Sequence, residues 1–210
     1  MKRLAIIGSG DLGQQIAYHA QTDNHYEVIG FFDDFRNKGE RINDLPILGK
    51  TNAIIDAFQQ KIFDELLIGI GYKHLVFKRE IYQKFKNKIP FGKLIHSSSI
   101  LDSSSIIKEG VVIYPGCIID QQVIIEENTL INVGCCIAHD TKIGAHSFLS
   151  PRVAIAGFVK VGESCILGIN STIIDNIQLV NNTQIGGGAV VIKNIEQEGL
   201  YVGNPVRFIR

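Results

Sequence analysis

A six-residue repeat runs through the C-terminal half of the sequence and restricts the fold more than any other feature. From residue 95 to residue 191, every sixth position is Leu, Ile or Val. A small or compact residue stands four positions later in nearly every hexad. A period of six fits neither an amphipathic helix nor a heptad coiled coil, whose periods are roughly 3.6 and 3.5 residues. The aliphatic positions are Ile95, Leu101, Ile107, Ile113, Ile119, Ile125, Ile131, Ile137, Ile143, Leu149, Ile155, Val161, Leu167, Ile173, Leu179, Ile185 and Val191.

Hexads of this kind predict a triangular coil of parallel strands in which each hexad forms one side. The branched aliphatic residue points inward and stacks on its copy three hexads later, and the compact residue fits near a tight corner. Cys117, Cys135 and Cys165 occupy compact positions, which predicts buried, reduced thiols. Glycines directly follow the aliphatic residue at several places, where we expect close turning of the backbone. These glycines are Gly144, Gly162, Gly168 and Gly186.

The first 92 residues follow a different pattern. Apolar runs at residues 2–8, 26–34 and 64–71 read as buried strands, and residues 12–21, 51–60 and 74–85 have helical periodicity. Strands that alternate with helices predict a small, mostly parallel α/β domain of the Rossmann-like kind. We therefore divide the chain into an α/β domain at 1–92 and an all-β domain at 93–210.

A glycine-rich turn follows the first strand of the α/β domain. Gly8, Gly10 and Gly13 stand in a G-x-G-x-x-G pattern whose backbone amides, at the start of a helix, suit a phosphate group. Asp33 and Asp34 end the second strand about 20 residues later, where a carboxylate can accept a ribose hydroxyl. NAD is one ligand with these groups, and a nucleoside diphosphate is another. A turn that serves only to tighten helix packing is the structural alternative.

Composition excludes several classes of protein. Lys plus Arg and Asp plus Glu both number 21, so no overall field favours a polyanion, and we expect no nucleic acid partner. No apolar run approaches the roughly 18 residues needed to cross a bilayer, so we expect no membrane span. The two basic residues at the start precede only a short apolar run, which reads as a strand and not as a signal peptide.

Taken in order along the chain, these motifs resemble a known family. The sequence runs from IIGSGDLG through DD, IGIG, LIH and the hexads to ILGINSTIIDNIQLVNNTQIGGGAVVIKNI and GLYVGNPV. It is similar to the bacterial sugar acetyltransferases related to the bacillosamine-pathway enzyme and to sialic acid O-acetyltransferases. The resemblance implies a left-handed β-helix, a homotrimer with acetyl-CoA between neighbouring β-helices, and a nucleotide-linked amino sugar held by the N-terminal domain.

The resemblance also assigns roles to particular residues. His139 matches the general base of the family, and Asp140 matches the acidic residue that orients it; without the family, the pair reads as an exposed turn. An imidazole suits removal of a proton from an attacking amine near neutral pH. Ile169 and Gly187 match positions along the coenzyme cleft, although Ile169 could simply pack between subunits and Gly187 could simply turn the coil.

The chain departs from the family pattern at several places. Nine residues after the base, where the family member has a second histidine near the acetyl-CoA, this chain has Phe148, and His146 stands two residues earlier. Phe148 and His146 are both candidate coenzyme contacts. The N-terminal turn has Asp11 and Leu12 where S-G-H-G is common, and Tyr72 follows Gly71 where asparagine is common. With the other turn residues, Asp11, Leu12, Gly71 and Tyr72 are candidate substrate contacts.

These observations lead to one expected function with two alternatives. We expect a cytoplasmic, trimeric N-acetyltransferase that transfers acetyl from acetyl-CoA to the 4-amino group of a nucleotide-linked 4-amino-4,6-dideoxy sugar, in surface polysaccharide biosynthesis. No metal is needed, and His139 and His146 lack a third histidine that could complete a zinc site. The alternatives are O-acetylation of a sialic acid-like sugar and a NAD(P)-binding regulator that uses the β-helix to oligomerise. The sequence leaves open the nucleotide base, the sugar configuration and the role of Arg207 and Arg210.

Overall fold

The computed structural model describes residues 1–210 and divides them into two compact units. The N-terminal unit comprises Met1–Leu94 and the C-terminal unit comprises Ile95–Arg210. The helices of the structure are all too short or too polar to cross a lipid bilayer. Each unit has its own hydrophobic core, so the two are described separately.

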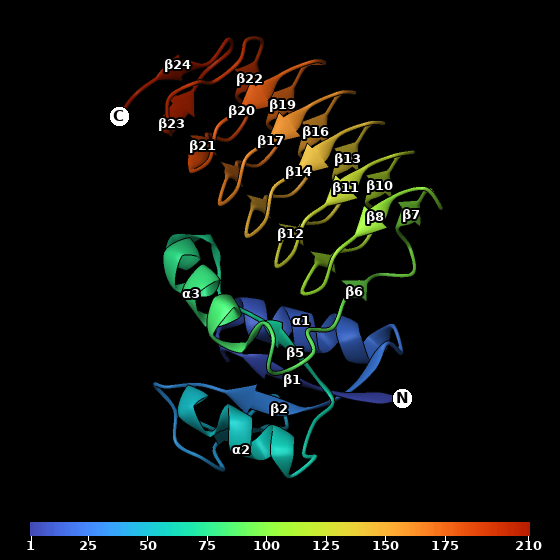
Figure 1. Ribbon diagram of the computed structural model, residues 1–210, viewed down its shortest axis with the longest axis vertical. Coiled ribbons are helices and arrows are strands. Elements are labelled where there is room, and N and C mark those ends of the chain that lie inside the picture. The colour runs from blue at the N-terminus through green and yellow to red at the C-terminus, as the bar shows by residue number, and fades with distance from the viewer. The chain divides into compact units, whose positions relative to one another are not determined.

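A five-stranded sheet organises the N-terminal unit, in the order β3-β4-β2-β1-β5 (Figure 1). All neighbours are parallel except β3 and β4, which form an antiparallel hairpin. Helices α1 and α2 lie on opposite faces of this sheet (Figure 1). The elements are β1 (Lys2–Ile7), α1 (Asp11–Thr22), β2 (Tyr26–Phe32), β3 (Arg41–Ile42), β4 (Leu45–Gly49), the 3-10 turn η1 (Thr51–Ala53), α2 (Ile54–Gln59), β5 (Glu65–Ile68), η2 (Tyr72–His74) and α3 (Leu75–Phe85).

The three strands and three helices predicted from the apolar runs are all present, because the strands are buried on both faces and each helix buries one side. Ala5 and Ile7 of β1 join residues of β5, α2 and α3 in one cluster, while α1 buries Ile16, Ala17 and Ala20. The hairpin of β3 and β4 was missed. Its signal is Asn43-Asp44, both with positive φ (47° and 64°), a pair suited to a two-residue hairpin turn.

The C-terminal unit is the predicted left-handed parallel β-helix. Almost every hexad contributes one two-residue strand, and each strand pairs in parallel with the strand three hexads later (Figure 1). The strands form three sheets, one for each side of the coil. The first sheet, called the D sheet here, contains β7 (Ile100–Leu101), β10 (Ile118–Ile119), β13 (Cys136–Ile137), β16 (Ala154–Ile155), β19 (Thr172–Ile173) and β22 (Val190–Val191).

The remaining strands form the E and C sheets. The E sheet contains β8 (Ile106–Ile107), β11 (Ile124–Ile125), β14 (Lys142–Ile143), β17 (Lys160–Val161) and β20 (Gln178–Leu179). The C sheet contains β6 (Leu94–Ile95), β9 (Val112–Ile113), β12 (Leu130–Ile131), β15 (Phe148–Leu149), β18 (Ile166–Leu167), β21 (Thr183–Ile185), β23 (Gly199–Val202) and β24 (Arg207–Phe208). Three corners connect these sheets, and we name each corner by the two sheets that it joins: D/E, E/C and C/D.

Side chains at the two repeating positions fill the interior. The aliphatic residues from Ile113 to Val191 are at most 3% exposed and form one continuous core. The compact residues add hydrogen bonds: Thr129 donates to the carbonyl of Gly144, Ser147 to that of Gly162 and Cys165 to that of Val180. Each donor thus reaches the carbonyl fifteen residues later. The compact positions therefore favour a side chain that is small and that also carries a hydroxyl or thiol donor.

Most corners of the β-helix contain one residue with left-handed φ. From Gly110 to Gly188 this residue recurs at every sixth position, three places after the aliphatic residue. The glycines that directly follow the aliphatic residue do not have positive φ. A Cβ on Gly144 would lie 2.4 Å from the carbonyl carbon of Gly162, and one on Gly162 would lie 2.5 Å from the nitrogen of Asn181. These glycines permit close stacking of successive coils, which corrects the expectation that they serve the turn itself.

The last residues cover the C-terminal end of the core. Tyr201 in β23 and Val206 pack against the cluster of aliphatic residues, and β23 continues the C sheet by pairing with β21. Such a cover shields the last coil, which has no further coil stacked on it. Arg207 and Arg210 lie exposed in this terminal segment.

Candidate active site

His139 and Asp140 lie at the D/E corner, directly after β13. Asp140 has left-handed φ (56°), and its Oδ2 lies 2.9 Å from Nδ1 of His139. The two side chains are 40% and 38% exposed. When the carboxylate accepts the Nδ1 hydrogen, the lone pair of the neutral ring is on Nε2. The predicted pair therefore presents an oriented imidazole with one free basic nitrogen.

The next coil holds the imidazole in place through two residues that the sequence analysis missed. A Cβ on Gly157 would lie 2.7 Å from Cε1 and 2.8 Å from Nε2 of His139, so only glycine leaves room for the ring. Phe158 meets the ring edge to face, with centroids 5.1 Å apart. Both residues stand eighteen positions after His139 and Asp140. This separation of eighteen residues, which is one full coil of the β-helix, is the sequence signal that could have identified them.

An apolar groove of about 350 Å³ lies on the outer face of the D sheet, beside this corner. Ala156 and Asp175 are among its lining residues. Ala156 precedes Gly157 in the chain, and Asp175 occupies the position of Gly157 one coil later. The imidazole and the groove are therefore neighbours. The other lining residues are Cys136, Ala154, Ile155, Thr172, Ile173 and Ile174.

Ile169 and Gly187 lie together at the C/D corner, one coil apart. A Cβ on Gly187 would lie 3.1 Å from Cγ2 of Ile169, and the amide of Gly188 donates to the carbonyl of Ile169 at 2.7 Å. Both residues are exposed. The C/D corner precedes the strands of the D sheet and the D/E corner follows them. Within one copy of the chain, the predicted base and the predicted coenzyme positions are thus on different corners.

The third corner, E/C, carries His146. Its side chain is buried (2% exposed), with left-handed φ (62°), and its Nδ1 lies 3.0 Å from Nδ2 of Asn128. Phe148 lies in β15, with its side chain 6% exposed. Neither residue shares the corner of His139 or that of Ile169 and Gly187. Their roles as coenzyme contacts stay predictions.

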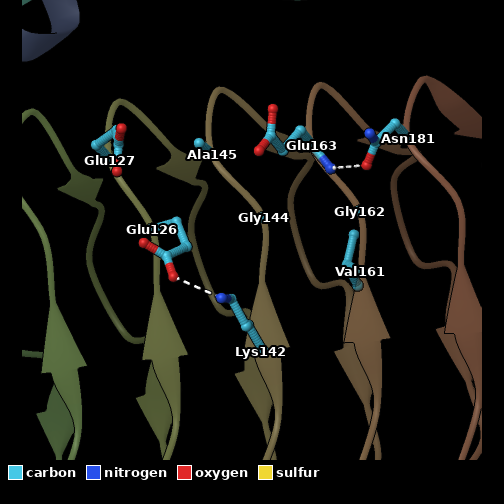
Figure 2. Close-up of a pocket in the computed structure, with 9 residues that line it drawn as sticks. All are labelled: Glu126, Glu127, Lys142, Gly144, Ala145, Val161, Gly162, Glu163 and Asn181. Atoms are coloured by element: carbon cyan, nitrogen blue, oxygen red, sulfur yellow. Dashed lines mark hydrogen bonds and ion pairs between the residues drawn. The ribbon is translucent and has the colours of Figure 1, made fainter.

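A second pocket, of about 320 Å³, is at the E/C corner (Figure 2). Glu126, Glu127 and Glu163 line it together with Lys142, whose Nζ lies 2.8 Å from Oε1 of Glu126. One cation among three carboxylates leaves the pocket acidic, and a coenzyme that carries several phosphates is repelled there. No group of three or more His, Cys, Asp or Glu side chains in the structure could hold a metal ion.

In the N-terminal unit, the glycines of the turn after β1 serve different purposes. Gly8 has left-handed φ (94°), and a Cβ on Gly13 would lie 2.0 Å from the carbonyl oxygen of Gly8, so these two are required by the turn and by packing. Gly10 and Gly71 have no heavy atom within 4 Å of a built Cβ. Packing does not explain these two glycines, and their backbone is open to a ligand.

Asp33 and Asp34 have structural partners. Oδ2 of Asp33 accepts hydrogen bonds from the amide and hydroxyl of Ser9, at 2.9 and 2.6 Å. Burial alone would raise the pKa of Asp33, but the hydrogen bonds from Ser9 and the Phe35 amide, together with the charge of Arg36, outweigh it and hold this pKa below its usual value. Asp34 accepts from the amide and hydroxyl of Thr51. The two carboxylates thus hold the surrounding loops in place. Their contact with a ribose hydroxyl, expected from the sequence, stays a prediction in addition to this structural role.

The other candidate substrate residues flank the two open glycines. Asp11 is the first residue of α1 and is exposed, and Leu12 follows it, half-buried. Tyr72 opens η2 directly after Gly71 and is 47% exposed. The structure therefore brings Gly8, Gly10, Gly71 and Asp33 to one edge of the sheet, where β1, β2 and β5 end. Their contact with a substrate stays a prediction.

Comparison with known proteins agrees with this architecture. Residues 3–85 match the family described as the PglD N-terminal domain. No curated protein sequence matches the chain. A histidine-to-alanine variant of GDP-perosamine N-acetyltransferase from Caulobacter crescentus, solved with CoA and GDP-perosamine, has a TM-score of 0.93 and 24% identity, covering 100% of this chain and 98% of that chain.

Two further solved structures match over the whole chain. The acetyltransferase domain of PglB from Neisseria gonorrhoeae has a TM-score of 0.91 at 23% identity, with 100% of both chains covered. WeeI from Acinetobacter baumannii has a TM-score of 0.64 at 17% identity, again covering 100% of both chains. The chain therefore has the fold of the Caulobacter and Neisseria acetyltransferases, a hexapeptide-repeat β-helix preceded by a domain that matches the PglD N-terminal family.

Proposed function

We propose that this chain is an N-acetyltransferase that transfers acetyl from acetyl-CoA to the 4-amino group of a nucleotide-linked 4-amino-4,6-dideoxy sugar. One observation carries the proposal. The imidazole of His139, oriented by Asp140 at 2.9 Å, lies over Gly157 beside an exposed apolar groove. The likeness to an enzyme solved with CoA and GDP-perosamine supports the class of donor and acceptor.

The reaction needs one base and one site for the developing negative charge. The amine nitrogen attacks the thioester carbonyl, and Nε2 of His139 accepts the proton that the nitrogen loses. The C–S bond then breaks, and the thiolate of CoA leaves and takes up the proton from the imidazolium of His139. Asp140 stabilises the imidazolium because its carboxylate accepts the Nδ1 hydrogen. A backbone amide stabilises the oxyanion of the tetrahedral intermediate.

The N-terminal unit suits a single nucleotide. Its parallel strands β4, β2 and β1 correspond to one mononucleotide-binding half, β5 adds a single strand beyond it, and a dinucleotide site needs two full halves. The open backbone at Gly10 and Gly71 lies where a diphosphate would approach. This favours a nucleotide sugar over NAD(P), and it assigns the N-terminal unit to the acceptor and the β-helix to the donor.

The outer face of the D sheet supports assembly of three copies. Its outward residues are mostly apolar, and Ile100 and Ile118 are 66% and 47% exposed. The E sheet begins with the outward residues Ile106 and Ile124, and its next three strands present Lys142, Lys160 and Gln178. Both the corner of His139 and the corner of Ile169 and Gly187 border the D sheet. A closed ring of copies packed through this face would set the base of one copy beside the coenzyme corner of its neighbour.

We place the enzyme in the cytoplasm and in the synthesis of surface polysaccharides. All four cysteines are free thiols, and three of them are buried, as is usual in a reducing compartment. A nucleotide-linked amino sugar with an acetylated amine is a precursor that a glycosyltransferase would consume. The location and the pathway both rest on the proposed acceptor.

Replacement of His139 by alanine tests the proposal. We expect kcat for acetyl transfer to fall about 10²- to 10⁴-fold because the general base is lost, with the assembly intact. His25→Ala is the matched control, since His25 Nε2 lies 2.6 Å from Oδ2 of Asp23, a similar pair in the N-terminal unit. Release of free thiol from acetyl-CoA measures the rate. Unchanged turnover in the His139 variant would remove this residue from the mechanism.

A panel of acceptors tests the substrate class. UDP-, dTDP- and GDP-linked amino sugars are offered with acetyl-CoA, and we expect turnover with at least one 4-amino sugar. A hydroxyl is a weaker nucleophile than a neutral amine and needs firmer assistance from the base. A response only to free sialic acid would identify the O-acetylating alternative and reject the amine acceptor.

A further inference from the structure

The loop after β2 presents a phenylalanine almost entirely to solvent. Phe35 is 95% exposed, and Phe77 in α3 is 43% exposed. Both rings line one cleft of about 80 Å³, together with Gly8 and Ile70. This cleft lies at the edge of the sheet where β1, β2 and β5 end. Ligands of open α/β sheets bind at this edge.

The backbone of Phe35 is fixed although its ring is exposed. Oδ1 of Asp33 accepts a hydrogen bond from the amide of Phe35 at 2.9 Å, while Oδ2 of the same carboxylate holds Ser9. The amide of Thr51, which also lines the cleft, donates to Oδ1 of Asp34 at 2.8 Å. An exposed ring on a fixed backbone costs little entropy to order, which suits it to a ligand.

The remaining chemistry of the cleft is mostly apolar. The carboxylates of Asp33 and Asp34 are already engaged by Ser9, Phe35 and Thr51. Apart from these carboxylates, which can still accept a ribose hydroxyl, the surface left for a ligand beside the open glycines consists mainly of two aromatic rings and aliphatic groups. Such a surface recognises a flat ring by stacking, which contributes about 1–3 kcal/mol per base in proteins that bind single-stranded nucleic acids.

We infer that Phe35 and Phe77 form the stacking surface for the base of the bound nucleotide. This inference rests on the proposed function, which assigns the nucleotide to the N-terminal unit. The ligand is a nucleoside diphosphate whose phosphates meet the turn at Gly8 and Gly10 and whose base packs on the two phenylalanines. Because every base has a flat face, we expect binding of GDP, UDP and dTDP to differ by less than about 10-fold.

A single tryptophan reports on this surface. The chain contains no tryptophan, so Phe35→Trp introduces the sole indole fluorophore. We expect titration of the full chain with GDP, UDP or dTDP to quench this fluorescence, and inorganic pyrophosphate to leave it unchanged. Tyr18→Trp is the matched control, because Tyr18 lies in α1 of the same unit and is 62% exposed but is outside the cleft. Quenching of both variants alike would overturn the inference.

Calorimetric titration with GDP measures the energetic contribution. We expect Phe35→Ala and Phe77→Ala each to raise the dissociation constant about 5- to 100-fold, and Phe35→Tyr to preserve binding. Unchanged binding by both alanine variants, or no binding of any nucleoside diphosphate by the native chain, would overturn the inference. Neither titration contains acetyl-CoA. Nucleotide binding without acetyl transfer would thus reject the proposed function alone, whereas transfer with an unchanged KM in Phe35→Ala would reject the inference alone.

Discussion

At the scale of single residues, the identity of the residue with left-handed φ at a corner bears on both stability and function. Glycine and asparagine occupy this position at little cost, whereas other residues pay about 1–2 kcal/mol for left-handed φ. Most corners of the C-terminal half use Gly or Asn. Phe158 has φ of 59° with its ring 52% exposed, and it packs edge to face on His139. The contact with the imidazole is a reason to keep a bulky residue there.

Replacement of Phe158 by asparagine separates stability from activity. We expect the midpoint of thermal unfolding to rise, because about 1 kcal/mol of backbone strain is relieved. We expect kcat to fall, because the imidazole loses its neighbour, while the KM for acetyl-CoA changes little. Ser164→Asn is the control, since Ser164 has the same left-handed φ (55°) one corner further on. Undiminished kcat in the Phe158 variant would show that the ring does not position the base.

The residues around His139 at the D/E corner were only partly predictable. His139 and Asp140 carry a recognisable chemistry in adjacent positions. Gly157 matters because a Cβ would lie 2.7 Å from the imidazole, and this clearance depends on the tilt of the ring. The period of the repeat identifies Gly157 and Phe158 as the residues that stack on His139 and Asp140. The requirement that Gly157 lack a side chain is visible only in the structure.

At the scale of elements, the β-helix is held by hydrogen bonds as well as by its aliphatic core. Ser147 donates to the carbonyl of Gly162 at 3.2 Å and accepts from the amide of Cys165 at 3.1 Å. Burial raises the pKa of the Cys165 thiol to about 11, so this thiol stays protonated and able to donate. Ser171 occupies an equivalent buried position, but its hydroxyl has no hydrogen-bond partner.

The two serines therefore predict opposite responses to alanine. Ser147→Ala should destabilise the protein by about 1 kcal/mol because two hydrogen bonds are lost, and the Cys165 amide loses a buried partner. Ser171→Ala should leave stability unchanged or raise it, because no hydrogen bond is lost and a buried hydroxyl is removed. Denaturant midpoints at one fixed protein concentration compare the variants. Equal destabilisation by both substitutions would contradict the hydrogen-bonded role of the compact position.

Most elements were predictable because each is amphipathic with a clear period. The hexads were predictable from their aliphatic residues, and the α/β unit from its buried runs. The hairpin of β3 and β4 was not predicted, because its strands are short and β4 contains Pro46. Turning was the role expected of Gly144 and Gly162, whereas their close contacts are with the next coil, and such contacts cannot be read from the local pattern.

At the scale of the whole molecule, the spacing of the repeat separates the proposed base from the proposed coenzyme positions. Two residues occupy equivalent positions of the same corner when their residue numbers differ by a multiple of eighteen. His139 and Gly157 are one such pair, and Ile169 and Gly187 are another. His139 and Ile169 differ by five hexads and so lie at different corners. This much could have been calculated from the sequence. Which surface of one copy meets which surface of another is not encoded in the period.

The account therefore requires that two copies complete each active site, with His139 from one copy and the corner of Ile169 and Gly187 from its neighbour. Two variants with complementary defects examine this requirement. His139→Ala removes the base, and Gly187→Trp fills the exposed coenzyme corner. Each variant alone should be nearly inactive, because every site in its assembly carries one defect.

Mixed assemblies of the two variants provide the most direct test. The differently tagged chains are refolded together in equal amounts, and the rate of thiol release is measured on purified mixed trimers. We predict recovery of about a third of the native sites, since in each mixed trimer a single interface takes its base from the Gly187 variant and its coenzyme corner from the His139 variant. Mixed trimers with no recovered activity would contradict an active site shared between copies.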